Sequence, residues 1–201
     1  MSQNSKEASA PKKPSFKQEQ LRHREQALVK AGAHLFAEKG YEHTTIEDVI
    51  GVVGISKPTF YSHFASKEAL AIKVIVSGLE RALSQVEKYA SILPPGEAAR
   101  AMIDWAIDNQ SGPDGEPAFS GSIAFFDRPE VLAAESRLTE RLADLINKGQ
   151  QEGTIGKVVH ARILSRTFRS ILKDNSFFDK SSRAQQEIDA LKEDLKGLLL
   201  G

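Results

Sequence analysis

A short stretch of this chain, residues 44–70, concentrates side chains that could contact nucleic acid. It reads TTIEDVIGVVGISKPTFYSHFASKEAL, with hydroxyl, aromatic and cationic residues gathered in its second half. The candidate base contacts are Lys57, Thr59, Tyr61 and His63. Donors, acceptors and apolar groups of this kind match the edges of base pairs in the DNA major groove. Ser56 adds a small hydroxyl where the backbone amides of a helix N-terminus can approach phosphates. The chemistry that these residues predict is therefore DNA binding.

Two short helices and a tight turn must hold these side chains in place. Thr44 and Glu47 have the spacing of a capping box, which predicts that the first helix begins there. Gly54 ends that helix and supplies a turn residue without side-chain obstruction. The apolar face of the helix consists of Ile46, Val49, Ile50 and Val53.

The second helix begins at Ser56 or Lys57. Pro58 is tolerated in its first turn, because the N–H that a proline lacks has no partner there. Phe60 and Phe64 lie four residues apart on one face and are expected to pack on the preceding helices. In a helix-turn-helix motif the first helix crosses the phosphate backbone and the second enters the major groove. The stretch is therefore predicted to be a helix-turn-helix.

Hydrophobic periodicity predicts helices along the rest of the chain as well. The expected ranges are 16–39, 66–92, 96–109, 129–150, 157–176 and 181–199, with a Gly/Pro loop at 111–122 that leads into a short helix through Phe125. We find no strand pattern and no internal repeat. The sequence therefore predicts an all-α protein of about nine helices. It divides into a disordered basic N-terminal arm (1–15), a helix-turn-helix DNA-binding domain (16–65) and a helical body (66–201).

Composition and missing motifs argue against several function classes. The chain is 40% hydrophobic and 27% charged, an ordinary globular composition, and contains no Cys for a disulfide or a thiolate metal site. We expect no signal peptide and no membrane span, which together with the lack of Cys fits a reducing cytoplasm. The histidines are scattered without metal-ligand spacing, and glycine-rich phosphate loops and G-x-S-x-G turns are absent. We therefore expect no enzyme activity, no cofactor and no bound metal.

The zero net charge hides an asymmetry along the chain. Residues 1–67 carry 10 Lys/Arg and 7 Asp/Glu (10 − 7 = +3), whereas residues 68–201 carry 17 and 20 (17 − 20 = −3). Four cations, Lys12, Lys13, Arg22 and Arg24, lie near the N-terminus. Either they form an arm that reaches an adjacent minor groove, or they belong to a solvated tail.

The segment AGAHLFAEKGYEHTTIEDVIGVVGISKPTFYSHFASKEAL resembles the N-terminal domain of the TetR family of bacterial transcriptional regulators. The matching residues are Ala31, Gly32, Leu35, Phe36, Gly40, Tyr41, Thr44, Thr45, Ile46, Gly54, Ile55, Ser56, Phe60, Tyr61, Phe64, Ser66, Lys67, Glu68 and Leu70. The resemblance covers residues 21–75 and rests on spacings that agree across four helices. The chain departs from the family at Gly51 and Val53, where alanines are usual, and at Pro58, where glycine is common.

The resemblance implies a three-helix DNA-binding head, a connecting helix, and a body that binds an effector and dimerises. It implies phosphate contacts for Thr45 at the start of the second helix and for Lys67 at the start of the fourth. A bound phosphate would also explain a cation at a helix N-terminus, where it opposes the helix macrodipole. The full predicted DNA-binding set is Thr45, Ser56, Lys57, Pro58, Thr59, Phe60, Tyr61, His63 and Lys67.

Aromatic residues of the body are candidates for an effector pocket. The set is Met102, Trp105, Phe119, Phe125, Phe126 and Phe168. Such residues either line a small-molecule pocket or fill the core, and the sequence leaves both readings open. The resemblance further implies a homodimer in which the helices at 157–176 and 181–199 of two chains form a four-helix bundle, and the apolar stripes of both segments permit this.

These expectations combine into one function. We expect a cytoplasmic, homodimeric DNA-binding transcriptional regulator, a repressor that binds a palindromic double-stranded operator and is released by a small-molecule effector. An activator of the same fold is the alternative within this class. A helical adaptor or enzyme with a merely structural three-helix head is the alternative outside it.

Overall fold

The computed structural model describes residues 15–109, 125, 127–157, 160–163 and 185–200. Its helices are α1 (Phe16–Lys39), α2 (Ile46–Val53), α3 (Lys57–His63), α4 (Lys67–Ile92), α5 (Pro95–Asn109), α6 (Pro129–Glu152) and α8 (Gln185–Leu200). The described part of the chain contains no strand, and the predicted all-α class is confirmed. The loop predicted at 111–122 and most of the helix predicted at 157–176 lie outside the described residues.

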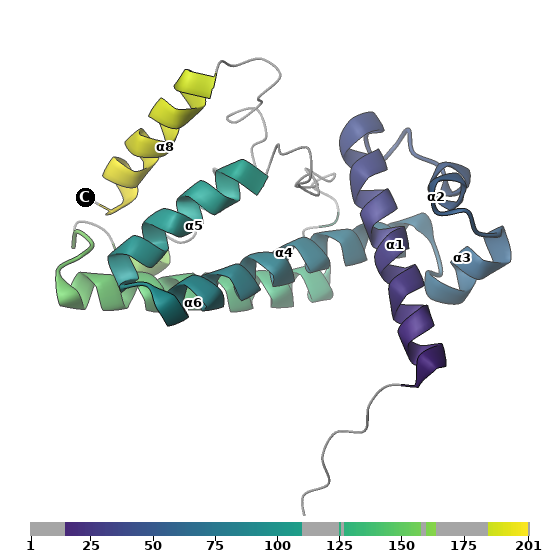
Figure 1. Cartoon of the computed structure of the whole chain (residues 1–201), viewed down its shortest axis with the longest axis horizontal. Helices are drawn as coiled ribbons and strands as arrows, with labels where there is room; N and C mark the ends of the chain where they lie inside the picture. The colour runs from purple at the N-terminus through teal and green to yellow at the C-terminus, as the bar shows by residue number, and fades with distance from the viewer. Residues whose placement is uncertain (1–14, 110–124, 126, 158–159, 164–184, 201) are drawn as a thin grey trace, which may run out of the picture.

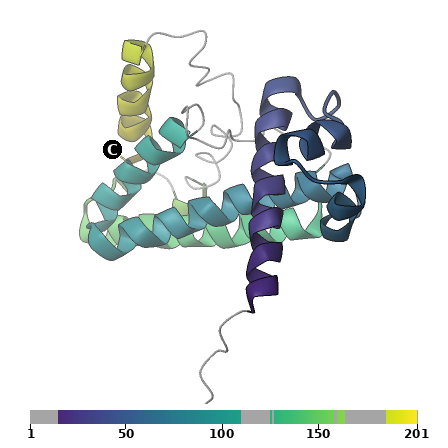
Figure 2. The same ribbon diagram turned by 45° about the vertical axis from the view of Figure 1, so that its right-hand side comes forward.

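Helix α4 joins two groups of helices. At one end, α1, α2 and α3 form a compact head in which α1 crosses the start of α4 (Figure 1). Helix α6 runs along α4, and α5 packs on both of them. Helix α8 lies against α5, far from the head, in both views (Figure 2). Helix α4 is therefore shared by the head and the body.

The core of the head depends on close contact between α1 and α4. Leu28, Phe36, Val49 and Phe60 are buried together with the first turns of α4. Gly32 permits this approach, because a Cβ at that position would lie 3.0 Å from Cδ2 of Leu70. The glycine of the small-residue pair at 31–32 thus has a packing role.

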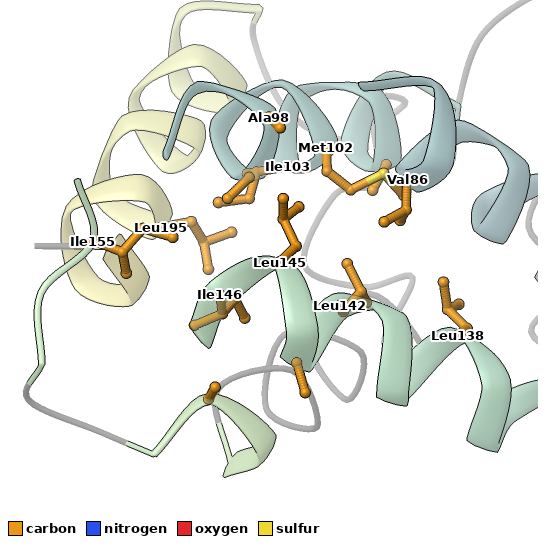
Figure 3. Packing of buried hydrophobic residues seen from close by; sticks show 14 of the residues in the cluster. Val86, Ala98, Met102, Ile103, Leu138, Leu142, Leu145, Ile146, Ile155 and Leu195 are labelled. Carbon is orange, nitrogen blue, oxygen red and sulfur yellow. The ribbon is translucent and has the colours of Figure 1, made fainter. Parts of the chain in front are cut away.

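The body has its own core between α4, α5 and α6. Val86, Met102, Ile103, Leu142 and Leu145 point toward one another across these helices (Figure 3). All of them are buried, and they belong to one continuous cluster that is distinct from the core of the head. Helices α4 and α6 each contribute residues to both cores.

Helix α8 already has a partner within the same chain. Ile188 and Leu195 are buried in the core of the body. The ammonium groups of Lys192 and Lys196 lie 2.6 Å and 2.7 Å from carboxylate oxygens of Asp108 and Asp104 on α5. The apolar side of α8 is therefore occupied by α5, and a dimer contact would have to use another face of this helix.

One predicted helix start is wrong by a residue. The capping box of α2 is formed by Thr45 and Asp48, in which the amide of Asp48 donates to Oγ1 of Thr45 and the amide of Thr45 donates to Oδ2 of Asp48. Thr44 is instead buried, and its hydroxyl donates to the carbonyl of Gly40 at 2.8 Å, at the end of α1. A hydroxyl turned into the core toward α1 cannot cap α2. The helix starts predicted at residues 56–57 and 66 are confirmed, with Ser56 and Ser66 as the N-caps of α3 and α4.

Candidate nucleic-acid interface

The turn between α2 and α3 sets the angle of the helix-turn-helix. Gly54 has φ 73° and ψ 38°, a left-handed conformation that favours glycine, and its amide donates to the carbonyl of Ile50 at 2.8 Å. The amide of Ile55 donates to the same carbonyl at 3.2 Å. These bonds end α2 and direct the chain into α3 after a turn of three residues, 54–56.

Two phenylalanines fix α3 to the head. Phe60 has no exposed surface, and its ring lies 6.0 Å from that of Phe64, which is also buried. Tyr61 is 48% exposed, and Phe60 supports its ring edge-on at 5.5 Å. The side of α3 away from the two phenylalanines therefore faces outward, and Tyr61 is its largest exposed group. Phe60 was predicted to contact DNA, but it lies in the core of the head and anchors α3 there.

The hydroxyl groups of the predicted DNA-binding set take part in helix caps. Oγ1 of Thr45 donates to Asp48 at 2.7 Å besides accepting from its amide. The hydroxyls of Ser56 and Thr59 lie 2.8 Å apart, and Oγ of Ser56 also accepts from the amide of Thr59. All three residues lie at the starts of α2 and α3, but their hydroxyls are shared with internal partners.

Lys57, the first residue of α3, makes an ion pair across the helix-turn-helix. Its ammonium lies 2.5 Å from Oε1 of Glu47 in the first turn of α2. The hydrogen bond raises the pKa of Lys57 and lowers the pKa of Glu47. Both side chains remain more than half exposed, at 52% for Lys57 and 61% for Glu47. Sequence reasoning assigned Glu47 only to a cap, because a partner ten residues away leaves no local signal.

Lys67, the first residue of α4, is held between two carbonyl groups. Its ammonium donates to the carbonyls of Tyr41 at 2.8 Å and Thr44 at 2.9 Å. It also lies 4.2 Å from the centre of the Tyr41 ring, a cation–π geometry. These contacts account for a cation at a helix N-terminus without a bound anion. An ammonium has three N–H donors, and the two carbonyls account for two of them.

His63 ends α3 with part of its ring turned inward. Nε2 of the imidazole is buried and has no hydrogen-bond partner. The side chain as a whole is half-buried. In this conformation Nε2 is covered by protein, so a base contact by His63 would have to use the exposed part of its side chain.

The head is joined to α6 by contacts near residue 125. The rings of Tyr41 and Phe125 meet edge-to-face at 4.7 Å. Beside them the guanidinium of Arg128, the N-cap residue of α6, donates to Glu68 of α4. Burial, followed by the negative charge of Glu68, raises the pKa of Tyr41. A residue range far from the helix-turn-helix in sequence thus contributes to the core of the head.

The predicted effector set is therefore divided. Met102 is buried in the core of the body, and Trp105 packs partly exposed against that core. Phe125 belongs to the core of the head instead. Its position in the sequence, far from the head, did not indicate this. Phe119, Phe126 and Phe168 lie outside the described residues.

In the described ranges, no three His, Asp or Glu side chains are grouped to hold a metal ion. None of the described helices is long and apolar enough to cross a membrane.

Comparisons with known proteins agree with this geometry. A family model described as "Bacterial regulatory proteins, tetR family" matches residues 28–74. The chain is 30% identical over 163 residues to the HTH-type transcriptional regulator TcmR of Streptomyces glaucescens, covering 77% of this chain and 66% of that protein. It is also 30% identical over 143 residues to the HTH-type transcriptional repressor KstR2 of Rhodococcus jostii, covering 71% of this chain and 67% of that protein.

Solved structures show the same fold. A TetR-family regulator from Agrobacterium tumefaciens superposes with a TM-score of 0.74 at 17% identity, covering 90% of this chain and all of that one (100%). AibR in complex with isovaleryl coenzyme A and operator DNA superposes with a TM-score of 0.70 at 17% identity, covering 88% of this chain and 98% of that one.

Proposed function

The chain belongs to the TetR family of bacterial DNA-binding transcriptional regulators, and from this premise we propose that it is a cytoplasmic repressor. It binds a palindromic operator as a homodimer and is released by a small-molecule effector. The observation that carries the proposal is the anchored recognition helix α3, whose outer side presents Tyr61 and Lys57. Membership in this family also supports the prediction that the chain is not an enzyme.

In the proposed complex, α3 of each head enters a major groove. Lys57 and Tyr61 lie toward the base edges, and Pro58 and Thr59 lie at the groove wall. Thr45, Ser56 and Lys67, at the N-termini of α2, α3 and α4, lie toward the phosphate backbone. Two heads related by a twofold axis occupy successive grooves about 34–36 Å apart. The operator is then palindromic because the dimer is symmetric.

Release by an effector follows from the position of α4. This helix contributes to the cores of both the head and the body, and α6 contacts it along its length. An effector that binds preferentially to a state with another head spacing lowers operator affinity, by at most the difference between its affinities for the two states. We place the effector near Met102 and Trp105. The relative KstR2, which is named as a repressor, supports repression.

Dimerisation would use the outward face of α8. Its inner face packs on α5 through Ile188 and Leu195, so both roles can coexist on one helix. The DNA-binding domain is proposed to span residues 16–65, and the effector-binding and dimerisation domain residues 66–201.

Equilibrium binding to duplex DNA tests this function. The full chain should bind duplex DNA with an affinity that falls linearly with salt on logarithmic axes. Native mass spectrometry of the protein should show a dimer, and small molecules that bind it should raise the dissociation constant for the operator. Binding to duplex DNA that is absent or independent of salt would refute the proposal.

A further inference from the structure

The charges on the helix-turn-helix do not favour DNA. Residues 45–64 contain one Lys against one Glu and one Asp (1 − 2 = −1). Lys57 is paired with Glu47, and Lys39 at the end of α1 lies 3.3 Å from Asp48. A segment that meets a polyanion would be expected to be basic, because phosphate contacts supply most of the non-specific affinity of DNA-binding proteins. An acidic side chain next to the cation of the recognition helix therefore needs an explanation.

If α3 enters the major groove as proposed, Glu47 lies at the DNA beside Lys57. Its carboxylate contacts the ammonium at the first position of α3, and residues at the N-terminus of a recognition helix contact base edges. Only one of the three donors of the ammonium is used by Glu47 in the described contacts. The other two can donate to neighbouring acceptors such as O6 and N7 of guanine.

We propose that Glu47 is a specificity-determining residue: its carboxylate holds the Lys57 ammonium at the N-terminus of α3 for donation to a base edge and repels phosphates from it. On non-specific DNA the ammonium stays paired with Glu47, and little counterion is released. On the correct sequence the base edge accepts from the ammonium while the pair stays intact. This inference rests on the proposed placement of α3 in the major groove.

Substitution E47Q tests the proposal in the full chain. The probes are a duplex that the wild-type protein selects from a random pool and a scrambled duplex of the same composition. Release of an exposed ion pair should tighten binding to the scrambled duplex by about 1.4- to 5-fold per head. On the scrambled duplex, the slope of log affinity against log salt concentration should steepen by about 0.9 per head, since Lys57 becomes free to contact a phosphate. Repeated selection with E47Q should show a relaxed preference at one base pair of each half-site.

Variant E25Q is the matched control. Glu25 pairs with Lys73 at 3.2 Å between α1 and α4, with the two side chains 41% and 42% exposed, and its replacement by Gln changes the net charge equally. E25Q should leave the selected motif unchanged. The proposal is overturned if E47Q gives the same ratio of affinities for the selected and scrambled duplexes as E25Q, and the same motif. It is also overturned if E47Q weakens binding to both duplexes equally.

Lys57→Met separates this proposal from the assignment of α3. It should relax the same base pair, and E47Q added to it should have no further effect on the motif. If Lys57→Met changes neither affinity nor motif, the placement of Lys57 on DNA fails, and the role of Glu47 fails with it. If Lys57→Met relaxes the motif and E47Q does not, only the role of Glu47 fails.

Discussion

Replacing Lys67 by Met distinguishes the internal role of this lysine from its role on DNA. Methionine keeps much of the length of the side chain and removes the ammonium, which in the structure donates to the carbonyls of Tyr41 and Thr44. Hydrogen bonds from a charged donor contribute about 1.5–3 kcal/mol each when buried. Because this site is only half-buried, we take about 2 kcal/mol for the two together, and the cation–π contact adds about 0.5–1 kcal/mol.

An opposing term has to be subtracted. A cation at a helix N-terminus is unfavourable, so its removal from the first position of α4 should return about 0.3–1 kcal/mol. The carbonyl contacts outweigh this, and the net loss should be about 2 kcal/mol. For a chain of this length, that lowers the melting temperature by about 4–8 °C. Thermal unfolding followed by circular dichroism measures the shift.

Lys73→Met is the control on the same helix. Lys73 makes only a half-exposed pair with Glu25, and such pairs contribute less than about 1 kcal/mol. A melting temperature of Lys67→Met that equals or exceeds that of the control would refute the internal role. Lys67→Met should also reduce the slope of log affinity for DNA against log salt concentration by about 0.9 per head, if the remaining N–H of Lys67 contacts a phosphate. An unchanged salt dependence would remove Lys67 from the DNA contacts.

Four further results are expected. Tyr61→Ala should weaken binding to the selected duplex while the melting temperature stays near that of the wild type, because the ring is 48% exposed; unchanged affinity in a gel shift would exclude Tyr61 from the interface. Gly51→Ala should stabilise the protein by about 0.5–1 kcal/mol in urea unfolding, since no atom lies within 4 Å of the added Cβ, and a loss of stability would contradict the helical geometry there. Hydrogen bonds from the Thr45 hydroxyl and amide, and then from Lys39, lower the pKa of Asp48 from 3.8 to about 2. The stability that the Asp48 charge contributes should therefore be nearly complete above about pH 4 and be lost as the pH falls through about 2; a difference in stability between wild type and Asp48→Asn that does not shrink between pH 4 and pH 2 would count against it. Light scattering at micromolar concentration should give the mass of a dimer, and a monomer mass would argue against the proposed assembly.

Helix positions could be predicted from the sequence because local signals specify them. The helix over 16–39 is observed with the predicted bounds, as Gly40 ends the apolar periodicity. The start of α2 was predicted one residue early, from Thr44 and Glu47, although Thr45 and Asp48 have the same spacing. Burial of Thr44 in the core decides between them, and burial is a tertiary property.

Side-chain partners could be predicted far less well. The ammonium of Lys67 contacts carbonyls 23 and 26 residues earlier, and Lys57 contacts a carboxylate ten residues earlier. Phe125 was grouped with Trp105 because both are aromatic residues of the body, yet it packs on Tyr41 of the head. Contacts of this kind depend on how helices cross, which periodicity alone does not encode.

The central claim is that two copies of α3 read DNA in successive major grooves. Sequencing the duplexes that the full chain retains from a random pool tests it most directly. A palindromic motif whose half-sites lie about 10–10.5 base pairs apart, centre to centre, is the result that this account predicts. Retained DNA without sequence enrichment, or a single site without twofold symmetry, would contradict it.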